Sequence, residues 1–259
     1  MIVELFGPPG VGKTTLAFAL VDRLRERGHD IRPIFSYRPS EDPFAPSRNP
    51  PRPNATAAAR RLLRPAFAVE ALGSVCSAFA GAREADMPAN LMRLLPPKSI
   101  VWSIRLHQYM SRLTRSWSDA AASRQTSLFD QGFVQAVCSL ALLSRTADQE
   151  LVAHALKSTP RADLLIKLQA PRELLEARLA ERQRRQGRLE QLFELDLKTT
   201  LDSVPIIDRL YELIQRDGRS VMCIDSVDRQ ALCDAVDRIE WELMASHGLN
   251  EAAGGGGKA

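Results

Sequence analysis

The sequence predicts an α/β fold in which a mainly parallel sheet is covered by helices on both faces. Short apolar runs alternate with amphipathic stretches, and a glycine-rich loop joins the first apolar run to the first amphipathic stretch. The chain has 259 residues, of which 45% are hydrophobic and 25% charged, enough for one α/β domain with a large insertion. We expect that domain to span residues 1–246. Ligands of such folds bind at the carboxyl ends of the strands.

The first predicted strand covers residues 2–6, and the loop after it reads G-P-P-G-V-G-K-T-T. The spacing G-x-x-x-x-G-K-T turns backbone N–H groups toward phosphates, puts Lys13 on the β and γ phosphate oxygens and offers the Thr14 hydroxyl to Mg²⁺. We therefore expect a nucleoside triphosphate to bind here, with a helix starting at the loop. The expected binding residues are Gly7, Gly10, Val11, Gly12, Lys13, Thr14 and Thr15.

The next elements are less regular. Residues 30–36 read as a second strand, at the edge of the sheet because Pro33 cannot donate to a ladder. Residues 39–53 are too rich in proline for a helix or a central strand. Residues 54–123 then predict a helical insertion with a break near Leu95, Pro96 and Pro97.

The second half of the chain returns to alternation. It predicts strands at 126–130, 163–168 and 220–224, and helices at 131–144, 171–188, 189–216 and 227–246. Residues 247–259 contain four consecutive glycines and predict a flexible tail.

Asp130 ends an apolar strand, as the carboxylate of a Walker B segment does. It is our candidate Mg²⁺ ligand together with Thr14, and the same carboxylate could act as a base toward an acceptor hydroxyl. The structural alternative is that Asp130 caps the following helix.

Arg178, Arg182 and Arg185 share one side of the helix predicted at 171–188. A mobile arginine segment of this kind can close over a triphosphate and neutralise the charge that develops during phosphoryl transfer. We therefore treat residues 171–188 as a lid and these arginines, with Lys13 and Asp130, as candidate catalytic residues. The alternative is a solvated helix face with Glu181 as an internal partner.

Trp102, Arg105, Tyr109 and Arg112 also share a helical face. Rings that stack on planar groups and guanidinium groups that hold anions together suit an acceptor pocket. Packing of this face against a neighbouring helix would give the same pattern. Arg38, which follows the second strand, is a further substrate-binding candidate and could equally be an ordinary loop arginine.

Charge and composition narrow the function classes. The formal net charge of +4 is mild, so nucleic acid is a less favoured partner than a small anionic molecule. The four cysteines form no metal-binding or redox motif, and we see neither a basic leader nor an apolar run of membrane-spanning length. We expect a cytoplasmic protein with no membrane partner. The oligomeric state is open, a homodimer included.

Taken together, the chain resembles the P-loop nucleoside and nucleotide kinases, most nearly the thymidylate kinase group. The resemblance rests on the loop at 7–15, the strand end L-F-D at 128–130 and the segment L-L-I-K-L-Q-A-P-R-E-L-L-E-A-R-L-A-E-R at 164–182. It implies a P-loop NTPase three-layer fold with a five-stranded, mainly parallel core and a helical lid. It also implies Mg·ATP as phosphate donor, with the acceptor held between the lid and the helices that follow the second strand.

The acceptor side departs from that group. Gln131 and Gly132 follow Asp130 where the group commonly has arginine, and its Arg-Glu-Pro-Gly segment is echoed only by Arg38 and Pro39. The resemblance therefore carries ATP as donor but not dTMP as acceptor. A small-molecule kinase is the leading hypothesis, and the alternatives are a regulatory or assembly NTPase without an acceptor and a polynucleotide end kinase.

Overall fold

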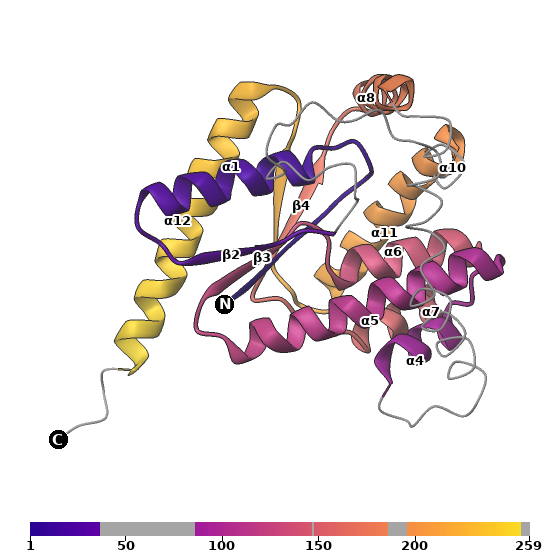
Figure 1. Ribbon diagram of the computed structural model, residues 1–259, viewed down its shortest axis with the longest axis horizontal. Coiled ribbons are helices and arrows are strands. Elements are labelled where there is room, and N and C mark those ends of the chain that lie inside the picture. The colour runs from indigo at the N-terminus through magenta and orange to yellow at the C-terminus, as the bar shows by residue number, and fades with distance from the viewer. Residues whose placement is uncertain (37–85, 147, 186–195, 255–259) are drawn as a thin grey trace, which may run out of the picture.

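In the computed structural model, residues 1–36, 86–146, 148–185 and 196–254 are described, with the side chains of residues 185 and 246–254 excepted. The described residues form one five-stranded sheet in the order β2-β3-β1-β4-β5 (Figure 1), and every neighbouring pair is parallel. The predicted mainly parallel sheet is thus confirmed. The strands are β1 Ile2–Phe6, β2 Ile31–Ile34, β3 Thr126–Phe129, β4 Leu164–Gln169 and β5 Val221–Asp225.

Helices cover both faces of this sheet (Figure 1). Helices α1 and α12 pack on one face with the inward side chains of β1 and β4, and α5, α6, α7 and α11 pack on the other. The helices are α1 Lys13–Glu26, α4 Met87–Leu94, α5 Ile100–Ala122, α6 Phe133–Ser144, α7 Gln149–Lys157, α8 Arg172–Arg185, α10 Leu197–Leu201, α11 Ser203–Arg216 and α12 Arg229–Gly254. Because all neighbouring strands are parallel, their carboxyl ends lie at one edge of the sheet.

Strand β1 lies at the centre of the sheet and contributes to both cores. Its side chains alternate between the faces, so Val3 and Leu5 join the cluster under α1, whereas Ile2 and Phe6 join the cluster under α6. Glu4 has the same parity as Ile2 and Phe6 and is fully buried. A parallel sheet covered on both sides leaves such a strand no solvated face.

Several predicted elements match the structure. Strand β2 is an edge strand and includes Pro33, and the break near Leu95 separates α4 from α5. Gly28 ends α1 with a φ of 82°.

Two expectations about helices are corrected. Helix α7 was missed, because its nine residues carry too short an apolar pattern to stand out from a loop. Helix α12 continues to Gly254, so a tail beginning at residue 247 is wrong. Leu249, Glu251, Ala252 and Ala253 are good helix formers, and the glycine run begins only at Gly254.

Some predictions fall on residues that the structure does not describe. They are Arg38, the proline-rich segment 39–53, residues 54–85 of the helical insertion, residues 186–188 of the lid and residues 255–259 of the tail. Among the described residues, no helix has both the length and the apolar character needed to span a membrane.

Candidate active site

The glycine-rich loop joins the carboxyl end of β1 to the first turn of α1. Gly10 and Gly12 have φ angles of 80° and 99°, a region that side-chain-bearing residues rarely adopt. A Cβ on Gly7 would lie 2.5 Å from the carbonyl oxygen of Leu168 in β4, so only glycine fits at that position. Helix α1 begins directly at Lys13, which leaves its first N–H groups facing the loop. The loop is therefore shaped to receive an anion.

The Lys13 side chain folds back into this loop. Its ammonium donates to the carbonyl oxygens of Gly7 at 2.7 Å and Pro8 at 3.1 Å, and the residue is only 7% exposed. The positive charge thus lies inside the loop, where it can contact bound phosphate oxygens.

Asp130 lies beside the loop because β3 is the neighbour of β1. The Thr14 hydroxyl donates to Asp130 Oδ2 at 3.1 Å, and the Ser36 backbone N–H donates to Oδ1 at 2.7 Å. Burial raises the pKa of Asp130, while these two donors and the charge of Lys13 act in the opposite direction. Helix α6 has Gly132 at its N-cap with no side-chain cap, so the capping alternative for Asp130 is wrong.

The Thr14 and Asp130 oxygens fit a magnesium ion. Hydroxyl and carboxylate oxygens are the hard ligands that Mg²⁺ takes, usually with waters and substrate phosphates completing the octahedron. No group of three or more His, Cys, Asp or Glu side chains that could hold a metal occurs in the described parts of the chain. A magnesium ion here would therefore depend on the phosphates of a bound nucleotide for the rest of its ligands.

Arg178 of α8 contacts backbone around the loop. Its guanidinium donates to the carbonyl oxygens of Ser226 at 3.0 Å, Val227 at 3.1 Å and Val11 at 3.5 Å. A Cβ on Gly12 would lie 3.1 Å from Ser226 Oγ, so the segment after β5 packs against the glycine-rich loop. Arg178 thus ties the connection between β5 and α12 to the loop, and a direct contact to phosphate stays a prediction.

The other predicted lid residues lie farther along α8. Arg182 is half-buried one turn beyond Arg178, whereas Glu181 pairs with Arg184 at 3.2 Å on the exposed surface. The backbone of Arg185 belongs to the last turn of α8, and its side chain lies outside the described part.

The predicted acceptor face on α5 divides into two parts. The Tyr109 hydroxyl donates to the Gln131 carbonyl oxygen at 3.3 Å, next to Asp130. Burial raises the pKa of Tyr109 above its usual range, and the charges of Asp130 and Glu4 raise it further, against the effect of Arg112. One turn earlier on α5, the Arg105 guanidinium stacks 4.6 Å from the centroid of the Trp102 ring. Tyr109 is therefore the member of this face that lies beside Asp130, and Arg112 is close enough to Tyr109 to affect its pKa.

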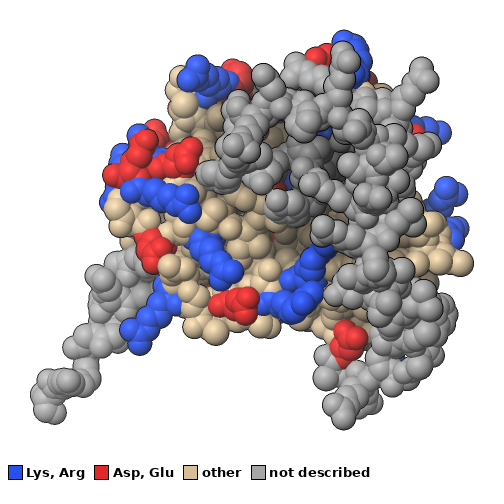
Figure 2. Space-filling view, viewed as in Figure 1, with Lys and Arg blue, Asp and Glu red and all other residues tan. Residues whose placement is uncertain are grey.

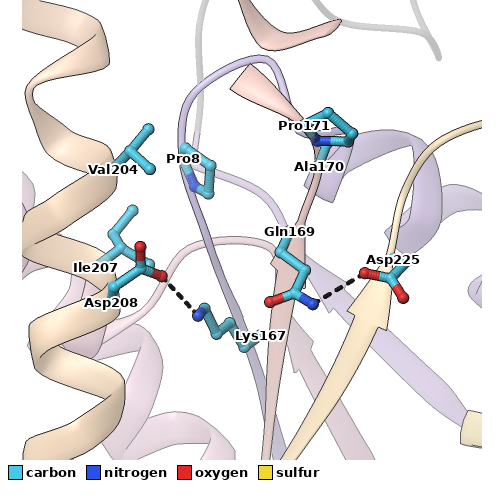
Figure 3. A pocket seen from close by; sticks show the side chains of 9 residues that line it. All are labelled: Pro8, Lys167, Gln169, Ala170, Pro171, Val204, Ile207, Asp208 and Asp225. Atoms are coloured by element: carbon cyan, nitrogen blue, oxygen red, sulfur yellow. Dashed lines mark hydrogen bonds and ion pairs between the residues drawn. The ribbon is translucent and has the colours of Figure 1, made fainter. Parts of the chain in front are cut away.

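The structure also shows a cavity of about 310 Å³ that the sequence did not predict (Figure 3). Lys167 and Gln169 point into it from β4, Asp208 from α11 and Asp225 from β5, and Pro8 of the glycine-rich loop borders it. Lys167 Nζ contacts Asp208 Oδ1 at 2.7 Å, and Gln169 Nε2 donates to Asp225 Oδ1 at 2.9 Å. A lysine within an apolar strand gave no sign of this partner.

Comparisons with known proteins do not identify a family. No family profile and no curated protein sequence matches the chain. Among solved structures, the chain is similar to the deoxyadenosine kinase of M. mycoides, solved with bound dCTP and also with the products dCMP and a flexible dCDP. Both alignments cover 95% of this chain and 100% of the kinase, at 14% identity and a TM-score of 0.47. A likeness at this level does not establish an activity.

Proposed function

We propose that the protein transfers the γ-phosphoryl group of Mg·ATP to a small acceptor bearing a hydroxyl or phosphate group. The observation that carries the proposal is the meeting of Lys13, Thr14 and Asp130 at the carboxyl ends of β1 and β3. Phosphoryl transfer needs little covalent help from a protein, and it depends on positioning and charge stabilisation. A glycine-rich loop with an internal lysine, a hydroxyl and a buried carboxylate supplies these features.

Each group has a distinct role in this proposal. The loop N–H groups and Lys13 bind the β and γ phosphates, and the Thr14 hydroxyl and Asp130 hold Mg²⁺ against the same phosphates. The contact between Thr14 and Asp130 favours the magnesium role of the carboxylate. The same position allows Asp130 to accept a proton from an acceptor hydroxyl.

Two arginines of α8 should affect the reaction differently. Arg182→Ala should lower kcat by about tenfold or more with little change in ATP affinity, because a lid charge acts mainly in the transition state. Arg178→Ala should weaken ATP binding instead, since Arg178 holds the segment after β5 against the loop. Steady-state kinetics and ATP titration separate the two effects. An Arg182→Ala enzyme with unchanged kcat would leave a solvated helix face as the explanation.

The acceptor should lie near Asp130, bordered by Tyr109, and should contact the rest of the face formed by Trp102, Arg105 and Arg112. We expect Arg105→Ala to raise the acceptor KM by about tenfold while the KM for ATP stays within about twofold, because the stacked guanidinium would contact the acceptor alone. Arg124→Ala, an exposed arginine beyond the end of α5, is the control. Equal effects on both KM values would place Arg105 outside the acceptor pocket.

The two alternative functions predict different behaviour. A regulatory NTPase hydrolyses ATP without an acceptor, and a polynucleotide end kinase needs a basic track along its surface. On the face shown in Figure 2, basic and acidic side chains of the described residues are interspersed, which favours a small acceptor over a polynucleotide.

A panel of nucleosides, nucleotides, sugars and short oligonucleotides, each assayed by ADP release, tests the proposal. Because closure of the site should wait for the acceptor, ADP release should be slow alone and rise sharply with one class of small molecule. Brisk release indifferent to every compound would favour the regulatory NTPase. Stimulation by oligonucleotide ends alone would favour the polynucleotide kinase.

A further inference from the structure

Glu4 is a buried acid directly beneath the candidate active site. It lies in the middle of β1, two residues before the glycine-rich loop starts after Phe6, and it is fully shielded from solvent. One carboxylate oxygen, Oε1, accepts the backbone N–H of Val134 at 2.7 Å in the first turn of α6. Glu4 therefore joins the strand that leads into the glycine-rich loop to the helix that follows Asp130.

Gly132 fits tightly against the Glu4 carboxyl group. A Cβ on Gly132 would lie 2.5 Å from Glu4 Cδ and 2.7 Å from Oε1, too close unless the Glu4 side chain moved. A side chain at position 132 would therefore displace the Glu4 carboxyl group.

These contacts bracket the short segment that carries Asp130. Phe129, the last residue of β3, pairs with Glu4 in the sheet, and Asp130, Gln131 and Gly132 then connect to α6. The Tyr109 hydroxyl of α5 donates to the Gln131 carbonyl oxygen of this connection. The connection is fixed at its start by the sheet, at its middle by Tyr109 and at its end by Glu4.

The free-energy cost of burying the Glu4 carboxyl group argues against a purely stabilising role for this residue. Its Oε2 is buried and has no hydrogen-bond partner among the described residues, and burial raises its pKa to about 7, against the opposing charge of Arg219 and the N–H groups of α6. A half-satisfied buried carboxyl group is more costly than an apolar side chain of similar size. A specific geometric task explains its presence better than stability does.

We propose that Glu4 is a positioning residue that, through Gly132 and the first turn of α6, holds Asp130 where it can bind Mg²⁺ beside Thr14. The proposal rests on the magnesium role given to Asp130 in the proposed function. It assigns Glu4 no contact with nucleotide, metal or acceptor.

The test measures ADP affinity by calorimetry with and without Mg²⁺. The ratio of the two affinities, here called the magnesium enhancement, reports the metal site independently of turnover. Glu4→Met keeps the side-chain length but removes the acceptor for Val134, and Gly132→Ala introduces the clash. Each should reduce the magnesium enhancement by about tenfold, the lower end of the effect of removing groups that orient metal ligands. Glu4→Gln keeps an acceptor oxygen, so its magnesium enhancement should stay within about twofold of the wild-type value.

A double substitution tests whether the two residues act through their contact. Glu4→Ala opens the space that a Cβ on Gly132 requires. The loss of magnesium enhancement caused by Gly132→Ala should therefore be at least about threefold smaller in the Glu4→Ala background than in the wild-type background. Thermal unfolding of every variant serves as the folding control. If Gly132→Ala alone does not fold, Glu4→Met still tests the proposal.

The outcomes separate this proposal from the proposed function. Unchanged magnesium enhancement in Glu4→Met and in the Gly132→Ala variants that fold, accompanied only by lower melting temperatures, would overturn the positioning role and leave Glu4 as a structural residue. If wild-type ADP affinity is itself indifferent to Mg²⁺, the magnesium role of Asp130 fails, and the proposal for Glu4 falls with it.

Discussion

Lys13→Ala is expected to lower turnover by about a hundredfold or more, the scale of losing a preorganised charge at a phosphoryl transition state. The Lys13 ammonium lies inside the glycine-rich loop, bonded to the carbonyl oxygens of Gly7 and Pro8. Alanine removes the charge that would contact the β and γ phosphates and leaves those two carbonyl groups without their donor. Initial rates at saturating ATP and acceptor measure the effect.

The folding control for this variant is its melting temperature, and the matched substitution is Lys157→Ala on the exposed end of α7. We expect Lys157→Ala to keep full turnover, since Lys157 belongs to neither strand end that forms the site. A folded Lys13→Ala protein with undiminished turnover would remove the glycine-rich loop from the reaction.

Asp130→Asn should reduce turnover by a similar factor, about a hundredfold, and shift the Mg²⁺ requirement to higher concentration. Asparagine keeps the shape and an oxygen that can accept from Ser36 or Thr14, so the substitution isolates the negative charge. ADP affinity without metal should change little. Magnesium titration of turnover, with ADP binding in parallel, measures both effects.

Asp119→Asn on the exposed face of α5 is the control for Asp130→Asn, because it removes the same charge away from the strand ends. Identical magnesium dependence in Asp130→Asn and wild type would exclude Asp130 as a metal ligand. If turnover nevertheless fell, the base role would remain as its explanation.

The glycine-rich loop was the most predictable part because its function requires a fixed local order of strand, turn and helix. The apolar run before it and the amphipathic stretch after it supplied that order, and the structure has β1, the loop and α1 in sequence. Pro33 likewise identified β2 as an edge strand, because a missing N–H is a local property. Features set by a few adjacent residues could be inferred from the sequence.

Features that depend on contacts between distant segments could not be inferred from the sequence. Glu4 gave no signal because a single acid in a short strand usually faces water, and here both sheet faces are covered. Arg178 looked like a free lid charge until the carbonyl groups of Ser226 and Val227 were placed beside it. The ion pair of Lys167 with Asp208 likewise joins residues about forty positions apart. The sequence also did not show which residue of the α5 face contacts the segment after β3, and in the structure it is Tyr109.

The fate of the γ-phosphoryl group tests the central claim most directly. ATP labelled with ¹⁸O in its γ-phosphoryl group is incubated with the protein, Mg²⁺ and the compound that most stimulates ADP release, and the products are analysed by mass spectrometry. Phosphoryl transfer predicts labelled phosphate bound to the organic acceptor, in amounts equal to the ADP formed. Label found only in inorganic phosphate, at a rate that no compound changes, would contradict the account.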